Sequence, residues 1–365
     1  PSSVASSFTS RPTVAVVRLP DADGPTFRLR PYALHPLKHA HNAALEFERF
    51  PVAEDELLAP PAGRDGMAIV WHGLNRGRVT LAAQAAGTLR LLLGQAVDHA
   101  RRRSTWGRPI AARELVQGRL ARIAAGIVAC DALAGWAAAA IDAGQSGELE
   151  AIAAKVTASR CVREAAIDAL GIHGGRAFLV GHPLGDSFHD HFAVTVYEGE
   201  SDLLSLALFK GLAKAHPLAA RADAAPLRRV GGWLAWRVAR LAAAGAGPDA
   251  GIADARLRAH AARARRLLAD LALRIDRVIR GHGPRIAERQ LQVEALAAEA
   301  RELAGMLAVA HHAAAAGDDR ARAAADCWCR IAGVRAGGGR LTAADHASLA
   351  DLGRSIVEPA ATRPR

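Results

Sequence analysis

The sequence predicts a mainly α protein, in which a partial β-domain precedes a helical bundle and an extra helical domain. From Asp65 onward, apolar residues recur at spacings of three and four, as on one face of a helix. Residues 11–64 instead carry short β-branched or alternating runs separated by Gly and Pro. With 365 residues and 51% hydrophobic content, the chain can bury a sizeable core.

The partial β-domain, residues 11–64, is predicted to hold only a few short strands. Thr13–Leu19 is a β-branched run, Thr26–Arg30 alternates apolar and polar residues, and Ala43–Phe47 is a third apolar run. A Pro- and Gly-containing turn separates the first two. Strands this few make a small sheet, whose edges are exposed unless another segment completes it.

The first helical domain is predicted over residues 65–216. A helix of ~30 residues spans ~45 Å, so three long helices can lie side by side in a bundle. The expected long helices are 68–102, 112–143 and 147–170, followed by an irregular segment at 171–200 and a short helix at 201–215.

The rest of the chain is predicted to be an amphipathic linker segment, residues 217–251, and a C-terminal helical extension, residues 252–365. We expect helices near 227–243, 252–281, 286–316, 318–335 and 343–356.

The linker segment contains an Arg-rich helix with one apolar face. Its apolar face consists of Leu227, Val230, Trp233, Leu234, Val238 and Leu241, and its arginines are Arg228, Arg229, Arg237 and Arg240. Such a helix either lies in a membrane interface or packs against the bundle, and the sequence leaves both open.

Charge and composition exclude several classes of function. Lys and Arg outnumber Asp and Glu by 47 to 36, a net charge of +11, but only 4% of residues are aromatic and the arginines are spread along helices. A nucleic-acid interface needs a concentrated basic patch with stacking aromatics, so we expect no nucleic acid as partner. No run approaches the ~18 apolar residues of a membrane span.

The cysteines predict the redox compartment of the protein, and the first residues predict a disordered end. Cys130, Cys161, Cys327 and Cys329 lack the spacing of a zinc site or a disulfide framework, so we expect buried free thiols in a reducing, cytoplasmic environment and no metal. Residues 1–10 form a Ser-rich tail without an initial Met, which predicts a disordered end on a processed or partial product.

The segment from Gly171 to Ser201 holds the candidate chemistry. His189, Asp190 and His191 would be ligands of a metal site only if they converged, and their spacing is a weak signal. Glu198, between Tyr197 and Gly199, is a candidate general base, because a Glu in an apolar cleft can accept a proton and a Gly lets a ligand approach. The alternative is a Glu that only caps a helix.

Three separated blocks together resemble the acyl-CoA dehydrogenase family, in its C-terminal half. They are Gly73–Gly87, Ala96–Ile110, and Gly174-Gly175 followed at the family's spacing by Asp190 and Tyr197–Gly199. The stretch from Leu257 to Trp328 resembles the extra helical domain of the very-long-chain subgroup. That subgroup uses the preceding region to associate with the inner membrane, which implies peripheral contact on the inner face of a membrane.

The resemblance implies α,β-dehydrogenation of long-chain acyl-CoA thioesters in fatty acid β-oxidation. Glu198 occupies the position of the catalytic base, which removes the α-proton while a hydride leaves the β-carbon for FAD. Tyr197, Gly199 and Arg78 occupy substrate-side positions. An electron-transfer flavoprotein would accept the electrons, and the family assembles as homo- or hetero-oligomers.

FAD is the implied cofactor, and five residues occupy its contact positions. They are Arg103, Trp106, Gln117, Gly174 and Gly175. An Arg can clamp a pyrophosphate and an aromatic ring can pack on the cofactor of a neighbouring subunit. The alternatives remain open: Arg103 as a solvated helix end, Trp106 as a core anchor, and Glu198 as a structural residue.

The sequence also departs from the family. Gly171 replaces a Gln, Ala177 a Gly, His189 an Arg and Glu200 a Thr. The family's N-terminal helical domain and the first half of its β-domain are not found in this sequence, so either a separate chain supplies them, or the sequence is a fragment, or the chain is a relic. Two functions follow as hypotheses: an acyl-CoA dehydrogenase lacking its N-terminal half, or a catalytically silent scaffold subunit derived from that family.

Overall fold

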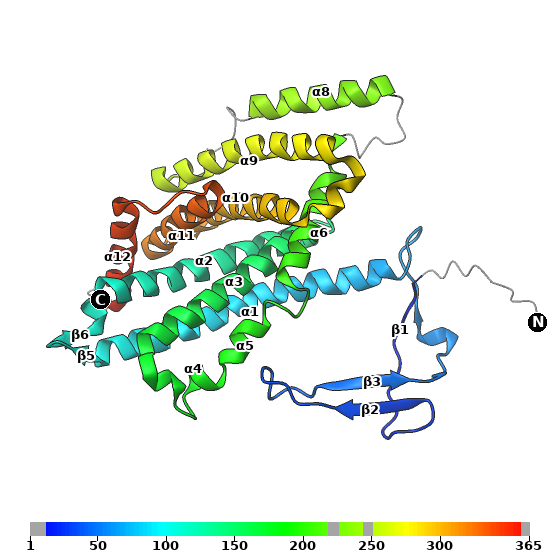
Figure 1. The fold of residues 1–365 in the computed structure, drawn as a ribbon, viewed down its shortest axis with the longest axis horizontal. Coiled ribbons are helices and arrows are strands. Elements are labelled where there is room, and N and C mark those ends of the chain that lie inside the picture. Colours follow the sequence, from blue (N-terminus) through cyan, green and yellow to red (C-terminus); the bar gives the residue numbers. More distant parts are fainter. Residues whose placement is uncertain (1–11, 218–225, 244–250, 359–365) are drawn as a thin grey trace, which may run out of the picture. The chain divides into compact units, whose positions relative to one another are not determined.

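The computed structural model describes residues 12–217, 226–243 and 251–358, so the predicted tail, residues 1–10, lies outside the described residues. The chain divides into two compact units, residues 1–77 and 78–365. The described part is mainly helical, with a small strand content near its start (Figure 1), which confirms the predicted fold class.

The first unit contains two short antiparallel pairs. Strand β1 (Val14–Ala15) pairs with β4 (Leu57–Leu58), and β2 (Phe27–Pro31) pairs with β3 (Ala43–Phe47) in a register that places Phe27 opposite Phe47. Phe27 is buried, with its ring 5.6 Å from that of Phe47, whereas Phe47 itself is 48% exposed. The predicted strand over residues 13–19 shrinks to two residues, because its only partner among the described segments is equally short.

The helices of the second unit lie close to the predicted positions. Helix α1 (Met67–Arg102) spans the division between the units, and a tight hairpin of β5 (Ser104–Thr105) and β6 (Arg108–Pro109) follows it. The other long helices are α2 (Glu114–Asp142), α3 (Glu148–His173), α6 (Ser201–Lys214), α8 (Pro226–Ala243), α9 (Ala255–His282), α10 (Gln290–Ala316), α11 (Asp319–Gly337) and α12 (Ala343–Val357).

The segment predicted to be irregular, residues 171–200, instead forms short helical turns. They are η3 (Gly174–Phe178), α4 (Pro183–Asp186) and α5 (Phe188–Ala193). Helix α4 starts because the ring Nδ1 of His182 accepts the backbone N–H of Leu184 at 3.3 Å and Pro183 takes the first helical position. The loop after α5 remains irregular, and it carries Glu198.

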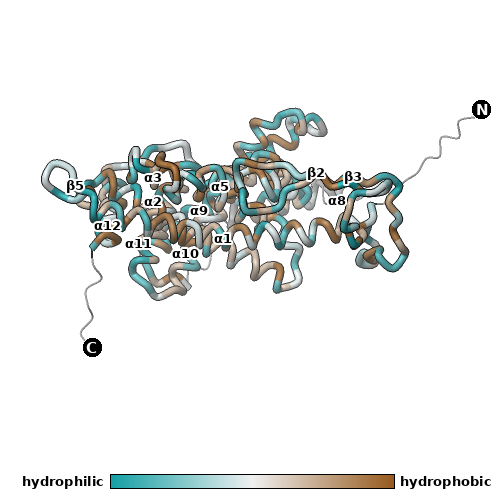
Figure 2. Tube along the Cα trace, turned by 90° about the horizontal axis from the view of Figure 1, so that it is seen from below, coloured by the Kyte–Doolittle hydropathy of each residue, from teal (hydrophilic) through white to brown (hydrophobic). Residues whose placement is uncertain are grey.

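Helix α2 is the central helix of the second unit. It packs against α3, α10, α11 and α12, and apolar segments gather where these helices lie together (Figure 2). By length and composition alone α2 could cross a membrane, but more than half of its most apolar window is buried inside the bundle. Packing therefore accounts for its apolar character.

Residues 65–216 and 252–365, which the sequence predicted to be two domains, pack against each other through a shared core. One hydrophobic core joins α2, α3 and α6 to α9, α10, α11 and α12. Ion pairs reinforce it: the guanidinium of Arg160 on α3 pairs with both carboxylate oxygens of Glu302 on α10, and Arg335 on α11 pairs with Glu164 at 2.8 Å. Residues 78–365 are therefore one compact unit.

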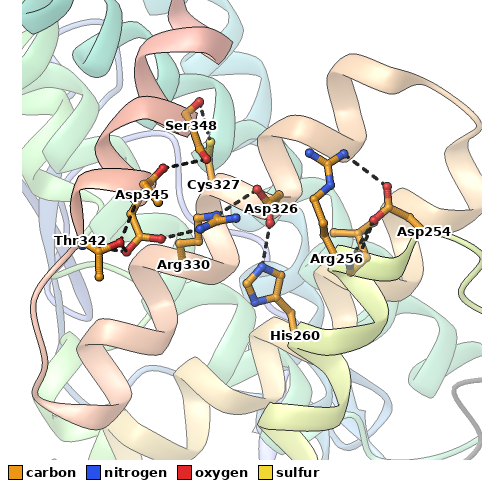
Figure 3. A network of polar contacts seen from close by, with 11 residues as sticks. Asp254, Arg256, His260, Asp326, Cys327, Arg330, Thr342, Asp345 and Ser348 are labelled. Atoms are coloured by element: carbon orange, nitrogen blue, oxygen red, sulfur yellow. Dashed lines mark hydrogen bonds and ion pairs between the residues drawn. The ribbon is translucent and has the colours of Figure 1, made fainter.

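A polar network fixes the last helices to one another (Figure 3). Asp326 on α11 accepts from Arg330 Nε at 2.9 Å and lies 2.8 Å from the ring Nε2 of His260 on α9. Arg330 also bonds Asp345 on α12 at 2.5 Å. The nearby Cys327 is buried, which raises the pKa of its thiol to about 12. All four cysteines are buried and free, as predicted.

Helix α8 is held on α9 by one buried carboxylate. Asp276 is 0% exposed and accepts from Trp233 Nε1 at 2.6 Å and from Arg237 Nη1 at 2.8 Å, while His216 Nε2 lies 3.1 Å away. Packing thus accounts for Trp233. Of the other predicted face residues, Leu234 and Val238 are exposed, and the side chains of Leu227, Val230 and Leu241 lie outside those described.

Replacing Asp276 by Ala should release α8. The change leaves the half-buried donors of Trp233 and Arg237 without their acceptor, a cost of at most the ~3–5 kcal/mol of a broken, fully buried pair. We expect amide hydrogen exchange over residues 226–243 to rise at least ~10-fold, with α2 unaffected. Asp270→Ala, on the exposed side of the same helix α9, is the control. Equal exchange in both variants would show that Asp276 does not hold α8.

Candidate functional site

A buried lysine holds the loop that carries Glu198. The Lys155 side chain, on α3, is 0% exposed, and its Nζ donates to the carbonyl oxygens of Gly199 at 2.6 Å and Thr195 at 3.3 Å. The two carbonyls bracket Glu198, so one ammonium group fixes both ends of a five-residue stretch. Sequence reasoning missed Lys155, although a charged residue within the small and apolar run Ala151–Val156 is a signal that could have found it.

The pKa of Lys155 lies much closer to neutral pH than that of a free lysine. Burial lowers its pKa to about 8, against the attraction of Glu200 and Glu198, which raise it. The nearby Arg78 lowers it further. An ammonium in such a place is retained because backbone carbonyls satisfy its donors.

The backbone of the loop turns sharply at its centre. Glu198 has φ +60° and Gly199 has φ +105°. A Cβ at residue 199 would also lie 3.0 Å from the Leu204 side chain, so only glycine fits there. A left-handed non-glycine residue costs ~1–2 kcal/mol, which the bonds to the loop carbonyls offset.

Arg78 and Glu198 come together although 120 residues separate them. Arg78, on α1, is 4% exposed, and its Nε donates to the backbone carbonyl of Glu198 at 3.2 Å. Burial lowers the pKa of the Arg78 guanidinium, and the Glu198 carboxylate partly offsets this. The structure thus brings together two residues that the sequence assigned to one site.

The Glu198 carboxylate has one oxygen available for chemistry. Its Oε2 is buried and makes no hydrogen bond to the described residues. A carboxylate oxygen without a donor keeps its full capacity to accept a proton. Tyr197 beside it is 38% exposed, and partial burial raises the pKa of its phenol.

Glu200 has a structural task that the sequence did not predict. Its carboxylate accepts the backbone N–H groups of Asp202 at 2.9 Å and Leu203 at 3.0 Å, which caps α6. Capping is therefore the role of Glu200, whereas Glu198 lies two residues earlier in the loop.

A second cluster lies at the other end of α1. Trp106, at the tip of the β5–β6 hairpin, is 90% exposed with φ +50°, so it is not a core anchor. The Arg113 guanidinium lies 4.6 Å from the centre of its ring, and Arg113 also bonds the Thr105 hydroxyl at 2.8 Å. The exposed Arg103 stands just before this hairpin. The hairpin presents an aromatic ring and a cation outward.

Gly174 and Gly175 follow the end of α3. Gly174 has φ +64°, and a Cβ at either position would meet no atom within 4 Å, so the backbone there is open to a ligand. The preceding His173 ring stacks 4.5 Å from that of His99. Burial, with His99 and His182 nearby, lowers the pKa of His173 to about 4, so it is neutral at physiological pH.

Gln117 does not face outward with these residues. It is 5% exposed, and its side-chain amide donates at 3.1 Å to the carbonyl of Ala111, in the short turn before α2. The backbone of α12 also packs closely here, because a Cβ at Gly353 would overlap the Gln117 backbone. The structure gives Gln117 a packing role.

The two clusters are far apart on the same chain. Arg78 and Arg103 lie 25 residues apart on or next to helix α1, or ~37 Å at 1.5 Å per residue. Over residues 12–217, 226–243 and 251–358, no three His, Cys, Asp or Glu side chains gather as metal ligands would.

Residues 64–213 match the family described as acyl-CoA dehydrogenase, C-terminal domain. This part of the chain is thus similar to an acyl-CoA dehydrogenase C-terminal domain. The matched range includes both clusters, from Arg78 to Gly199.

Several curated proteins are similar to less than half of this chain. An acyl-CoA dehydrogenase of Bacillus subtilis is 34% identical over 173 residues, 47% of this chain and 45% of the relative. A 3-(aryl)acrylate reductase of Clostridium sporogenes is 31% identical over 41% of this chain and 40% of its own length. The very long-chain specific acyl-CoA dehydrogenase of Bos taurus is 29% identical over 47% of this chain and 26% of its own length. The chain spans less than half the length of these relatives.

One solved structure has a similar fold over most of the chain. An acyl-CoA dehydrogenase from Bacillus anthracis, crystallised with FAD, superimposes with a TM-score of 0.70 at 16% identity, over 92% of this chain and 63% of its own. Because so little of this chain is left out, the likeness in fold includes helices after residue 252.

The pH dependence of folding stability should reveal the lowered pKa of Lys155. Its pKa is about 8 when folded and 10.5 in a free chain, so between these values the unfolded chain holds a proton that the folded chain has lost. Stability therefore rises with pH across this window, by at most ~1.4 kcal/mol per pH unit, and falls as the pH drops through 8.

The measurement is urea unfolding of the wild-type chain and of Lys155→Met from below pH 8 to above pH 10.5. The variant should lack the rise, while Lys210→Met, which removes an exposed lysine of α6, should keep it. Parallel curves for the wild type and Lys155→Met would refute the charge assigned to Lys155.

Proposed function

We propose that this chain is the C-terminal half of an FAD-dependent acyl-CoA dehydrogenase, which introduces an α,β double bond into long-chain acyl-CoA thioesters in fatty acid β-oxidation. The observation that carries the proposal is the Glu198 loop. Its carboxylate has a buried oxygen with no hydrogen-bond donor, and Lys155 and Arg78 hold the loop backbone. The loop lies within the residues that match that family.

Glu198 would act as the base. Its Oε2 would accept the α-proton of the thioester, while the two electrons of the β-carbon–hydrogen bond leave with that hydrogen and the double bond forms. Gly199 lets the loop turn at this point, since its φ is +105° and a Cβ there would lie 3.0 Å from the Leu204 side chain. The bond from Arg78 Nε to the backbone carbonyl of Glu198 holds the loop in place.

The outward-facing residues fit a flavin dinucleotide. Arg103 supplies an exposed cation for a pyrophosphate, Trp106 an exposed ring, and Gly174 and Gly175 an open backbone. Bound FAD would supply the two-electron acceptor for the hydrogen that leaves the β-carbon. Gln117, whose amide bonds the carbonyl of Ala111, is the one predicted contact without support.

The separation of ~37 Å along α1 supports an oligomer. Glu198 and the Arg103–Trp106 hairpin would then serve two different sites, each completed by another copy or by a partner chain that supplies the N-terminal half. We place the protein in the cytoplasm, with an electron-transfer flavoprotein as acceptor and no nucleic acid as partner. Exposed Leu234 and Val238 on α8 are where contact with the inner face of a membrane would occur.

The very-long-chain type is part of this proposal. The support is that α9 to α12 extend the bundle in one shared core, as the sequence resemblance implied. The matched relatives include other chain-length types, so the acyl chain has to be tested.

The test is a visible absorption spectrum of the purified chain after incubation with FAD, followed by anaerobic addition of palmitoyl-CoA. We expect bound flavin whose absorbance bleaches on addition of the acyl-CoA. Flavin that binds without bleaching would mean that the acyl pocket needs a partner chain. A chain that binds no flavin, alone or with a candidate N-terminal partner, would favour a silent scaffold.

The hairpin can be tested separately. Arg103→Ala with Trp106→Ala should reduce the fraction of bound FAD at least ~10-fold, because it removes one charge-assisted contact and one ring contact. Arg90→Ala, on the exposed surface of α1, is the control. Equal flavin content in both proteins, measured after gel filtration, would remove the hairpin from the cofactor site.

A further inference from the structure

A pocket lies on the far side of the Glu198 loop, between α3, α6 and α10. Its volume is about 120 Å³, well above the ~10–15 Å³ that a single water needs. Thr195 and Ser201, which close the loop through a 3.1 Å backbone bond, form one wall. The other lining residues are Val156, Arg160, Arg163, Asp202, Ser205, Glu294 and Arg301.

Arg301 is the unusual member of this lining. It is 7% exposed, yet its Nη1 bonds only a neutral group, the Ser205 hydroxyl, at 3.1 Å. Its nearest carboxylate, Glu302, lies 3.7 Å from Nη2, and its buried Nε makes no hydrogen bond. A buried guanidinium that is paired this weakly is costly to retain.

Glu302 is already engaged by another arginine. Both of its oxygens accept from Arg160, in a fork-to-fork pair. Arg160 thus holds both oxygens of the carboxylate nearest to Arg301, which leaves Arg301 without a hydrogen-bonded carboxylate among the described residues. Burial and the charge of Arg160 both lower the pKa of Arg301, against the attraction of Glu302 and Glu294.

The remaining charges of the pocket lie nearer to solvent. Arg163 and Asp202 are exposed and Glu294 is half-buried, so these three are hydrated where Arg301 is not. The first amides of α6 are already bound by Glu200 and offer no further donors. Arg301 is therefore the group that a ligand would have to meet.

We propose that this pocket binds a small inorganic oxyanion, of the class of phosphate or sulfate, with Arg301 as its main ligand. A tetrahedral oxyanion pairs with the planar fork of a guanidinium and supplies the missing negative charge. Ser201 and Thr195 line the same pocket, with their hydroxyls donating to loop carbonyls, so the anion would lie against the loop that carries Glu198.

The experiment is calorimetric titration of the full chain with inorganic phosphate at constant ionic strength set with chloride. We expect one site per chain, and Arg301→Gln should weaken it at least ~10-fold. Arg354→Gln, an exposed arginine on α12, and Arg103→Gln, at the hairpin, should leave it unchanged. These controls separate the pocket from general attraction to a basic protein and from the proposed cofactor site.

A second variant keeps the test decisive if Arg301→Gln fails to fold. Glu294→Gln removes the more buried of the two carboxylates that line the pocket. It should tighten phosphate binding by at least ~3-fold, because it removes the repulsion between this carboxylate and the bound anion. The proposal is overturned if the wild-type chain shows no phosphate site, or if Arg103→Gln abolishes the site, or if Glu294→Gln leaves the affinity unchanged.

Discussion

The bonds from the buried Lys155 ammonium to the carbonyls of Thr195 and Gly199 are the constraint on which the candidate site depends. The loop between α5 and α6 contains a residue in the left-handed region, Glu198, which a free loop would relax. Lys155 from α3 and Arg78 from α1 hold its backbone from two helices. The side chain of Glu198 is therefore placed by the bundle, and its Oε2 stays without a donor.

The helices after residue 252 contribute to this support although none of them carries a predicted site residue. Helix α10 packs against α2, α3 and α6, so it lies behind the helices that position Lys155 and the start of α6. Arg160 and Glu302 join α3 to α10 by a buried pair. Removing one partner of such a pair costs ~3–5 kcal/mol, so the extension and the bundle are expected to fold together.

The sequence predicted the helices well because their apolar period is long, and it predicted the Arg78–Glu198 meeting because separate motifs resembled one family. Lys155 was missed because a single lysine in a helix is ordinarily solvated, and only its burial shows its task. The spacing of apolar residues also does not tell which helices share a core. The shared core of the helices within residues 78–365 is seen only in their packing. Gln117 matched a motif position, but its amide bonds Ala111. The predicted strand at residues 13–19 was too long, because strand length depends on pairing with a segment distant in the sequence, here Leu57–Leu58.

The most direct test of the central claim, that this loop presents Glu198 as a base toward an acyl thioester, follows proton removal itself. The chain is incubated with FAD and palmitoyl-CoA in D2O, and proton NMR measures loss of the α-hydrogen signal. The account predicts exchange in the wild-type chain, its loss in Glu198→Gln, and no change in Glu114→Gln, an acidic residue at the start of α2. Exchange at the same rate in Glu198→Gln would contradict it.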